Sequence, residues 1–260
     1  MIIGVYDSGL GGLSVWRELR RRIGAHLIYF GDTAHLPYGD KSPEQLEEYF
    51  RASLAFFQSR GCHAVVVACN TTSSVVLPRL RHELPLPVVG MIEGAVQAAA
   101  AVSRGCLGVL ATRATAASGI YQQALQEGLP GTKVLMQAAP ELVPLVEAGQ
   151  VAGAGVKQVL ARYLEPLLDG GIDSVLLGCT HYSFLLEPIK ELVGAGVQVI
   201  DPAPAVAHKV EASWAVPSLQ DGTTEFWVSA QPQKFKATAE RILGELLPTV
   251  KLAKLRGEDR

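Results

Sequence analysis

Two cysteines that follow strand-like runs have the clearest potential for chemistry in this sequence. The segment VVVACNT contains Cys69 and the segment VLLGCTH contains Cys179, 110 residues further on. In each, a short aliphatic run predicts a buried parallel strand, and the thiol is followed by small hydroxyl or amide residues. Ligands of open α/β sheets bind beyond the carboxyl ends of the strands, beside helix N-termini. We therefore expect both thiols to face a binding site.

A thiol at a helix N-terminus is favoured as thiolate, so we expect the pKa of both cysteines to fall below the ~8.5 of free cysteine. If one thiolate removes a proton from a carbon acid and the other thiol delivers one to the opposite face, the product is the mirror-image centre. The pair therefore predicts racemisation without a cofactor. The alternative for either cysteine alone is a buried residue that only fills space.

A second correspondence indicates that the chain contains two similar halves. Gly4 begins GVYDSG and Gly108 begins GVLATR, 104 residues apart, which is close to the spacing of the cysteines. The expected fold is therefore α/β, with two similar α/β domains, mostly parallel sheets and an approximate two-fold relationship. Equivalent cysteines would then reach a cleft between the domains from opposite sides.

Short aliphatic runs alternate with longer stretches of helical period, as in βα units. The runs lie at residues 2–6, 26–30, 64–68, 88–90, 106–111, 134–136, 174–177 and 197–200. We expect one domain over residues 1–97 plus 208–260, on the Cys69 side, and the other over 98–207, on the Cys179 side. The strand-like 225–230 and a helix over 234–247 should complete the first domain, and residues 251–260 should be frayed.

Composition limits the class of protein. Over 260 residues, 23 Lys+Arg against 25 Asp+Glu leave a net charge of −2, so nothing suggests a nucleic-acid partner. No apolar run reaches the ~18 residues of a membrane span, and the N-terminus lacks the pattern of a signal peptide. We expect a cytoplasmic protein without a membrane partner. Cys62 and Cys106 are expected to serve packing, and the chain shows no zinc-type spacing.

Three features near the cysteines could assist them. The segment DSGLGG offers a carboxylate at Asp7 and glycines that could form a nest for a substrate carboxylate, although Asp7 could equally be a helix N-cap. His181 could polarise Cys179 or bind a carboxylate. The turn-rich segment GDTAHLPYGDKS could close over a ligand through Tyr38 and Gly39, or it could be an ordinary surface loop.

The segments VYDSGLGGLSV, GDTAHLPYGDKS, ACNTTSS and LGCTHYSFL, in this order and spacing, resemble the glutamate racemases of the cofactor-independent aspartate/glutamate racemase superfamily. The resemblance covers nearly the whole chain. It implies a two-domain α/β protein with its active site between the halves, which interconverts L-glutamate and D-glutamate for peptidoglycan synthesis. It also implies that no cofactor or metal is needed and that the protein forms a homodimer.

The resemblance also implies residue roles. Cys69 and Cys179 match the two acid/base thiols, Asp7 matches the carboxylate that assists the first, and His181 with Glu147 matches the assistants of the second. The positions that match substrate-contacting residues are Asp7, Ser8, Tyr38, Gly39, Asn70, Thr71, Thr112, Thr115, Thr180 and His181. Tyr121 resembles a further residue that lines the pocket. His35, which stands where the family often has arginine, is one of a few departures, none of which involves a thiol.

Several alternatives remain open. An aspartate racemase, or another amino-acid racemase of the same superfamily, would differ in a pocket contact worth only ~1–3 kcal/mol for one methylene. A two-lobed amino-acid binding protein would use the same cleft with structural cysteines. A metal-dependent hydrolase is a third alternative from a different class.

Overall fold

Two parallel sheets organise the chain in the computed structural model, which describes residues 1–80, 82–216 and 222–255. One sheet has six strands in the order β10-β9-β2-β1-β3-β4 and the other has four in the order β6-β5-β7-β8. The strands are β1 (Ile2–Asp7), β2 (His26–Gly31), β3 (Ala64–Val67), β4 (Val88–Val89), β5 (Cys106–Ala111), β6 (Lys133–Ala138), β7 (Ser174–Gly178), β8 (Gln198–Ile200), β9 (Thr224–Val228) and β10 (Val250–Leu252).

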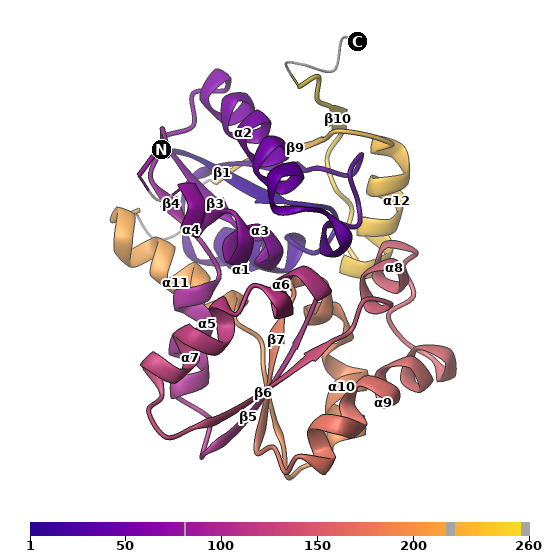
Figure 1. Cartoon of the computed structure of the whole chain (residues 1–260). Coiled ribbons are helices and arrows are strands. Elements are labelled where there is room, and N and C mark those ends of the chain that lie inside the picture. Colours follow the sequence, from indigo (N-terminus) through magenta and orange to yellow (C-terminus); the bar gives the residue numbers. More distant parts are fainter. Residues whose placement is uncertain (81, 217–221, 256–260) are drawn as a thin grey trace.

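Helices cover both sheets and separate the strands along the chain (Figure 1). They are α1 (Leu13–Arg22), η1 (Tyr38–Asp40), α2 (Pro43–Ser59), α3 (Asn70–Val75), α4 (Leu77–Leu80), α5 (Ile92–Ala100), α6 (Arg113–Ala117), α7 (Ile120–Gly128), α8 (Leu142–Glu147), α9 (Ala154–Asp169), η2 (Thr180–Leu185), α10 (Leu186–Val193), α11 (Ala203–Trp214) and α12 (Pro232–Leu243). The expected fold of two α/β domains with parallel sheets is confirmed.

The two sheets repeat one strand order and one register. The order β2-β1-β3-β4 in the first sheet matches β6-β5-β7-β8 in the second. Tyr6, two residues after Gly4, pairs with Val67, and Leu110, two residues after Gly108, pairs with Leu177. Each cysteine follows that partner by two residues. The segments that match in the sequence therefore occupy equivalent positions in the two sheets. As a result, the two thiols follow the ends of equivalent strands, β3 and β7.

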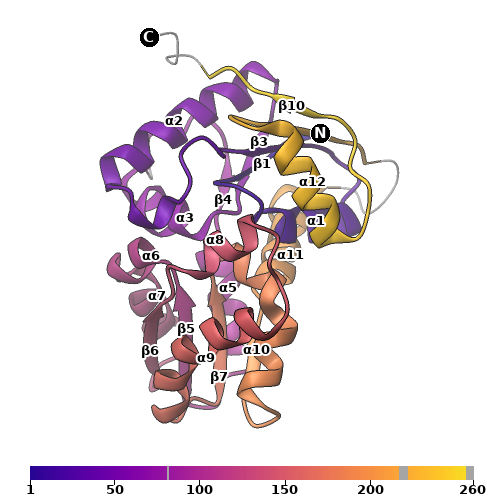
Figure 2. The same ribbon diagram turned by 90° about the vertical axis from the view of Figure 1, so that its right-hand side faces the viewer.

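The C-terminal segment lies against the first sheet. Strand β9 pairs with β2 and extends the first sheet, and Figure 2 shows α12 and β10 beside it. The expectation that residues from 251 onward are frayed was wrong for β10, because Val250 is buried and the strand pairs with β9. Residues 256–260 lie outside the described residues. Helix α12 ends at Leu243, before Leu247, because Gly244 adopts a left-handed φ of 70°.

Local sequence explains the long helices. Ser42 caps α2 in a capping box with Gln45, and Pro43 occupies the first helical position. Helix α9 buries one stripe of apolar residues at helical spacing, which consists of Val156, Leu160, Leu164 and Leu167. The expected domain boundary after residue 207 falls inside α11, which packs on both α1 and α5. No helix in the described ranges is long and apolar enough to cross a membrane.

Candidate active site

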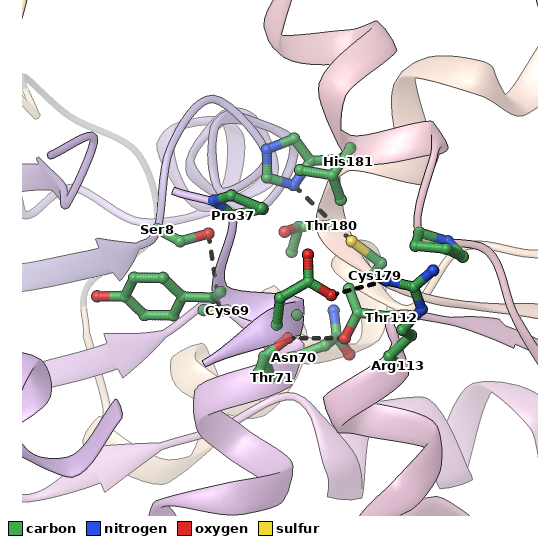
Figure 3. Close-up of a pocket in the computed structure, with 15 residues that line it drawn as sticks. Ser8, Pro37, Cys69, Asn70, Thr71, Thr112, Arg113, Cys179, Thr180 and His181 are labelled. Atoms are coloured by element: carbon green, nitrogen blue, oxygen red, sulfur yellow. Dashed lines mark hydrogen bonds and ion pairs between the residues drawn. The ribbon is translucent and has the colours of Figure 1, made fainter. Parts of the chain in front are cut away.

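A small cavity lies where the carboxyl ends of the two sheets face each other (Figure 3). Its walls come from the segments that follow β1, β2 and β3 in one domain and β5, β6 and β7 in the other. The lining residues are Ser8, Pro37, Tyr38, Gly39, Asp40, Cys69, Asn70, Thr71, Thr112, Arg113, Pro140, Val143, Cys179, Thr180 and His181. Both cysteines thus reach one cavity from different domains.

The structure corrects the expected acidity of Cys69. The residue caps α3, as its position at a strand end predicted, yet burial raises the pKa of its thiol to about 12 and the charge of Asp7 adds to the rise. Thr72 lowers this pKa through its hydroxyl and backbone N–H, but less than burial raises it. The expectation was wrong because α3 has only six residues, whose N-terminal charge is smaller than the desolvation of a buried thiolate. At neutral pH Cys69 is a thiol, with Sγ 4.0 Å from the Ser8 hydroxyl oxygen.

The thiol of Cys179 lies beside the imidazole of His181, whose other ring nitrogen is bonded to Glu147. Sγ of Cys179 is 3.8 Å from Nδ1 of His181, and Nε2 of His181 donates to Oε1 of Glu147 at 2.6 Å. Burial by itself would lower the pKa of His181. Its hydrogen bonds to Cys179 and Glu147, together with their charges, outweigh burial and raise this pKa well above its ordinary value. A cationic imidazolium at neutral pH therefore faces the cavity next to Cys179.

Asp7 lies behind the cavity rather than in its lining. It is fully buried, its Oδ1 accepts the N–H of Gly9 at 2.9 Å, and its Oδ2 accepts the Thr180 hydroxyl at 3.1 Å. Burial raises the pKa of Asp7, although the charge of His181 opposes this. The N-cap interpretation was wrong, since α1 is capped at Gly12. Asp7, the last residue of β1, instead connects the two domains through its hydrogen bond with Thr180, the residue after Cys179.

The glycines of DSGLGG allow the second domain to approach this closely. A Cβ added at Gly9 would lie 2.2 Å from Oε1 of Glu147, and one at Gly11 would lie 2.4 Å from Nδ1 of His181. Glu147 also accepts the N–H of Leu10 at 2.8 Å. The structure thus gives these glycines a packing role at the interface between the domains. A nest for a substrate carboxylate stays a prediction.

Three threonine hydroxyls form a second contact between the domains beside the cavity. Thr71 Oγ1 lies 3.0 Å from Thr112 Oγ1 and 3.2 Å from Thr115 Oγ1, and Thr112 also caps α6. Thr115 is fully buried behind Thr71 and Thr112 and does not line the cavity. Tyr121, expected in the lining, also lies behind it, where its hydroxyl donates to Oδ1 of Asn70. These two residues support lining residues instead of forming the wall.

The segment after β2 is anchored at the cavity instead of lying free on the surface. Tyr38 and Gly39 lie in η1 and line the cavity. The Tyr38 hydroxyl donates to Oδ2 of buried Asp32 at 2.5 Å and lies 2.6 Å from the Tyr6 hydroxyl. Asp32 also pairs with His35, whose Nδ1 is 2.8 Å away. Of the two interpretations of this loop, the one that places it over the site is supported.

Five of the lining residues were not predicted from the sequence, namely Pro37, Asp40, Arg113, Pro140 and Val143. Arg113 is a cation at the cavity, and its guanidinium pairs with Asp40 across the interface at 3.1 Å. Its position directly after Thr112, at the end of a predicted strand, was the signal that could have identified it. Within the described ranges, no three His, Cys, Asp or Glu side chains gather closely enough to hold a metal ion.

The sequence of the chain matches a known protein family. Residues 3–210 match the Asp/Glu/Hydantoin racemase family. The chain belongs to this racemase family. A glutamate racemase from Gloeobacter violaceus is 43% identical over 244 residues, which cover 92% of this chain and 91% of the relative. Because the family's members and these relatives are racemases, the chain is an isomerase.

Solved structures of racemases share the fold over almost the full length. A glutamate racemase from Bacillus anthracis is 33% identical, covers 98% of this chain and 97% of its own, and superimposes with a TM-score of 0.91. A glutamate racemase from Francisella tularensis in complex with D-glutamate is 28% identical, with the same coverage of the two chains and a TM-score of 0.88. The racemase fold therefore extends through both domains.

Proposed function

We propose that this chain is a glutamate racemase that interconverts L-glutamate and D-glutamate by proton transfer at Cα between Cys69 and Cys179. One observation carries the proposal: two thiols, one from each domain, line a single cavity. Two groups that approach one carbon from different domains can reach opposite faces of it. The relatives named glutamate racemase, and the related structure with D-glutamate, support glutamate as the substrate.

The proposed step exchanges one proton for another. The thiolate takes the proton from Cα as the Cα–H bond breaks, and the carbanion then takes a proton from the thiol on the other face. After each turnover the protonation states of the two sulfurs are exchanged. The high pKa of Cys69 keeps it as thiol in the resting protein, so we propose that Cys69 is the proton donor and Cys179 the base for one enantiomer, and that the two roles are exchanged for the other.

The cavity walls provide donors for the carbanion. The α-proton of an amino acid is a far weaker acid than a thiol, so fixed donors around the α-carboxylate must stabilise the charge that develops. Ser8, Thr112 and Thr180, which carry hydroxyls, and Asn70, which carries an amide, line this space. We propose that they bind the substrate carboxylates. Asp7 would assist the Cys69 side, and His181 with Glu147 the Cys179 side.

Deuterium exchange tests the function. The protein is incubated with L-glutamate in D₂O, and we expect D-glutamate to form with deuterium at Cα. Binding of L-glutamate without exchange would support the two-lobed binding protein instead. L-aspartate in a parallel incubation tests the competing substrate, and faster turnover of aspartate would overturn the choice of glutamate. Metal analysis of protein purified without chelator tests the hydrolase alternative.

We propose that the protein acts in the cytoplasm, that it supplies D-glutamate for peptidoglycan, and that it forms a homodimer. Rescue of a bacterium that requires added D-glutamate would support the first two. A molar mass near twice the 27.7 kDa of one chain, measured by light scattering, would support the third.

A further inference from the structure

The side-chain amide of Asn70 is partnered at one end and free at the other. Asn70 is the first residue of α3 and is 2% exposed. Its Oδ1 accepts a hydrogen bond from the hydroxyl of fully buried Tyr121 at 2.5 Å. Its Nδ2 is buried and has no partner in the part of the chain that the structure describes. A buried donor without a partner is rare in folded proteins and indicates that a ligand completes it.

The orientation of this amide decides what it can bind. Rotation of an asparagine amide by 180° exchanges an acceptor for two donors, and only the donors can bind a carboxylate. Burial raises the pKa of Tyr121, so its hydroxyl stays protonated and can donate. Donation to Oδ1 keeps that oxygen away from the cavity and leaves the N–H groups available to it. The rotated amide would turn its oxygen toward the substrate carboxylate and repel it.

Tyr121 and Asn70 belong to different domains. Tyr121 lies in α7, 51 residues from Asn70 in the sequence. The neighbouring Thr71 also bonds across the interface, to Thr112 and Thr115. The first turn of α3 is therefore oriented by the second domain. The placement of this amide therefore depends on contacts between the two domains.

We infer that Tyr121 is a positioning residue, which fixes the Asn70 amide with Nδ2 toward a substrate carboxylate when the two domains are docked. This inference rests on the proposed function for the identity of the ligand. It does not require Tyr121 to touch the substrate, since the residue lies behind the lining. Its effect must pass entirely through Asn70, which makes it testable by paired substitutions.

Steady-state kinetics test the inference first. Tyr121→Phe removes only the hydroxyl, and loss of one neutral hydrogen bond weakens binding by about 3- to 10-fold. We expect the KM for glutamate to rise by about this factor while kcat changes less, because the amide binds a carboxylate in ground and transition states alike. In an Asn70→Ala background, the same substitution should change KM less than about twofold.

Tyr163→Phe is the matched control. Its hydroxyl donates to Glu141 at 2.6 Å on the exposed side of the same domain, away from the cavity, so its KM should equal that of the wild type. Equal effects of Tyr121→Phe with and without Asn70 would overturn the inference, because the tyrosine would then act by another route. An unchanged KM in Tyr121→Phe would also overturn it.

A second measurement does not depend on turnover. Asn70 is the only asparagine of the chain, so ¹⁵N-asparagine labelling yields one side-chain NH₂ group in an NMR spectrum. We expect this signal to move when D-glutamate is added and to require about 3- to 10-fold more D-glutamate in Tyr121→Phe. Equal titrations would contradict the inference. If the wild type binds D-glutamate without racemising it, the proposed function fails, and this titration alone decides the role of Tyr121.

Discussion

Glu147 holds His181 in place: its Oε1 accepts the imidazole Nε2–H at 2.6 Å, while Nδ1 of the same ring lies 3.8 Å from Sγ of Cys179. The same carboxylate oxygen accepts the N–H of Leu10 from the other domain. Glu147 itself does not line the cavity. Any effect of Glu147 on the thiol of Cys179 therefore has to pass through the imidazole of His181, at the contact between the domains.

Removing the charge of Glu147 should change how activity depends on pH. The raised pKa of His181 keeps the ring cationic until the pH passes that value, and Glu147 contributes to the rise. In Glu147→Gln the pKa of His181 should fall, so the imidazolium loses its proton at a lower pH. The alkaline limb of the profile of kcat/KM against pH should therefore shift to lower pH. Loss of a charge-assisted hydrogen bond should lower kcat/KM by about 10- to 100-fold at pH 8. Profiles of kcat/KM between pH 5 and 10 measure both effects.

Glu141→Gln is the control for this experiment. Glu141 immediately precedes α8, but its partners Arg162 and Tyr163 are on the exposed side of the domain. The Glu141→Gln profile should match that of the wild type. A Glu147→Gln profile that keeps its shape would show that Glu147 does not set the charge of His181.

Each proposed acid/base thiol should be indispensable. Cys69→Ala and Cys179→Ala remove a proton donor or acceptor from one face, so racemisation should fall by about 10²- to 10⁴-fold or more. Circular dichroism and thermal unfolding should show that both variants fold. Cys106→Ala should retain activity, since its Sγ faces the carbonyl of Gly170 far from the cavity lining. Full activity in either alanine variant of the pair would rule out the two-thiol reaction.

The buried, ionised carboxylate of Asp7 should lower the free energy of unfolding at neutral pH. Its folded-state pKa is raised by burial, so the folded protein holds the proton at a higher pH than the unfolded chain, whose aspartates titrate near ~3.9. The ionised carboxylate therefore reduces the free energy of unfolding above the folded-state pKa, and this loss disappears as the pH falls toward about 4.

The isosteric variant Asp7→Asn should make this visible. Its oxygen can still accept the N–H of Gly9, and no charge is buried. We expect a higher Tm than the wild type at pH 8, a smaller difference at pH 4, and a loss of racemase activity. A lower Tm at pH 8 would mean that the ionised carboxylate stabilises the fold after all.

Gly11 should be required for the approach of the domains. A methyl group there would lie 2.4 Å from Nδ1 of His181 and 2.5 Å from Oγ1 of Thr180, so the second domain has to shift. Because a displacement of about 1 Å can lower a rate by ~10²-fold, Gly11→Ala should reduce kcat strongly. Gly155→Ala, in α9 with open space around its Cα, should retain activity and unfold at the same or a higher temperature. Equal activity of the two variants would contradict the packing role of the loop.

Local sequence patterns predicted most of the helices and strands, but they did not predict where these end or which strands pair. The stripe of α9 and the capping box of α2 are properties of a few adjacent residues, and both were predictable. Strand β10 was not, because its three residues form a strand only by pairing with β9. Lys251 illustrates this: it was expected to be frayed, and its ammonium instead bonds Glu225. A long-range pairing of that kind leaves no local period to detect.

The order of strands and helices, and the equivalent positions of Cys69 and Cys179 at strand ends, follow from the sequence, because hydrophobic period and spacing are encoded residue by residue. Only the tertiary structure determined which side chains from distant parts of the sequence contact one another. The contacts of Glu147 with His181 and of Tyr121 with Asn70 join residues 34 and 51 positions apart. Tertiary structure also set the pKa of Cys69 to about 12, against the expectation from its place at a helix start. Desolvation depends on everything packed around a group, and no stretch of sequence contains that information.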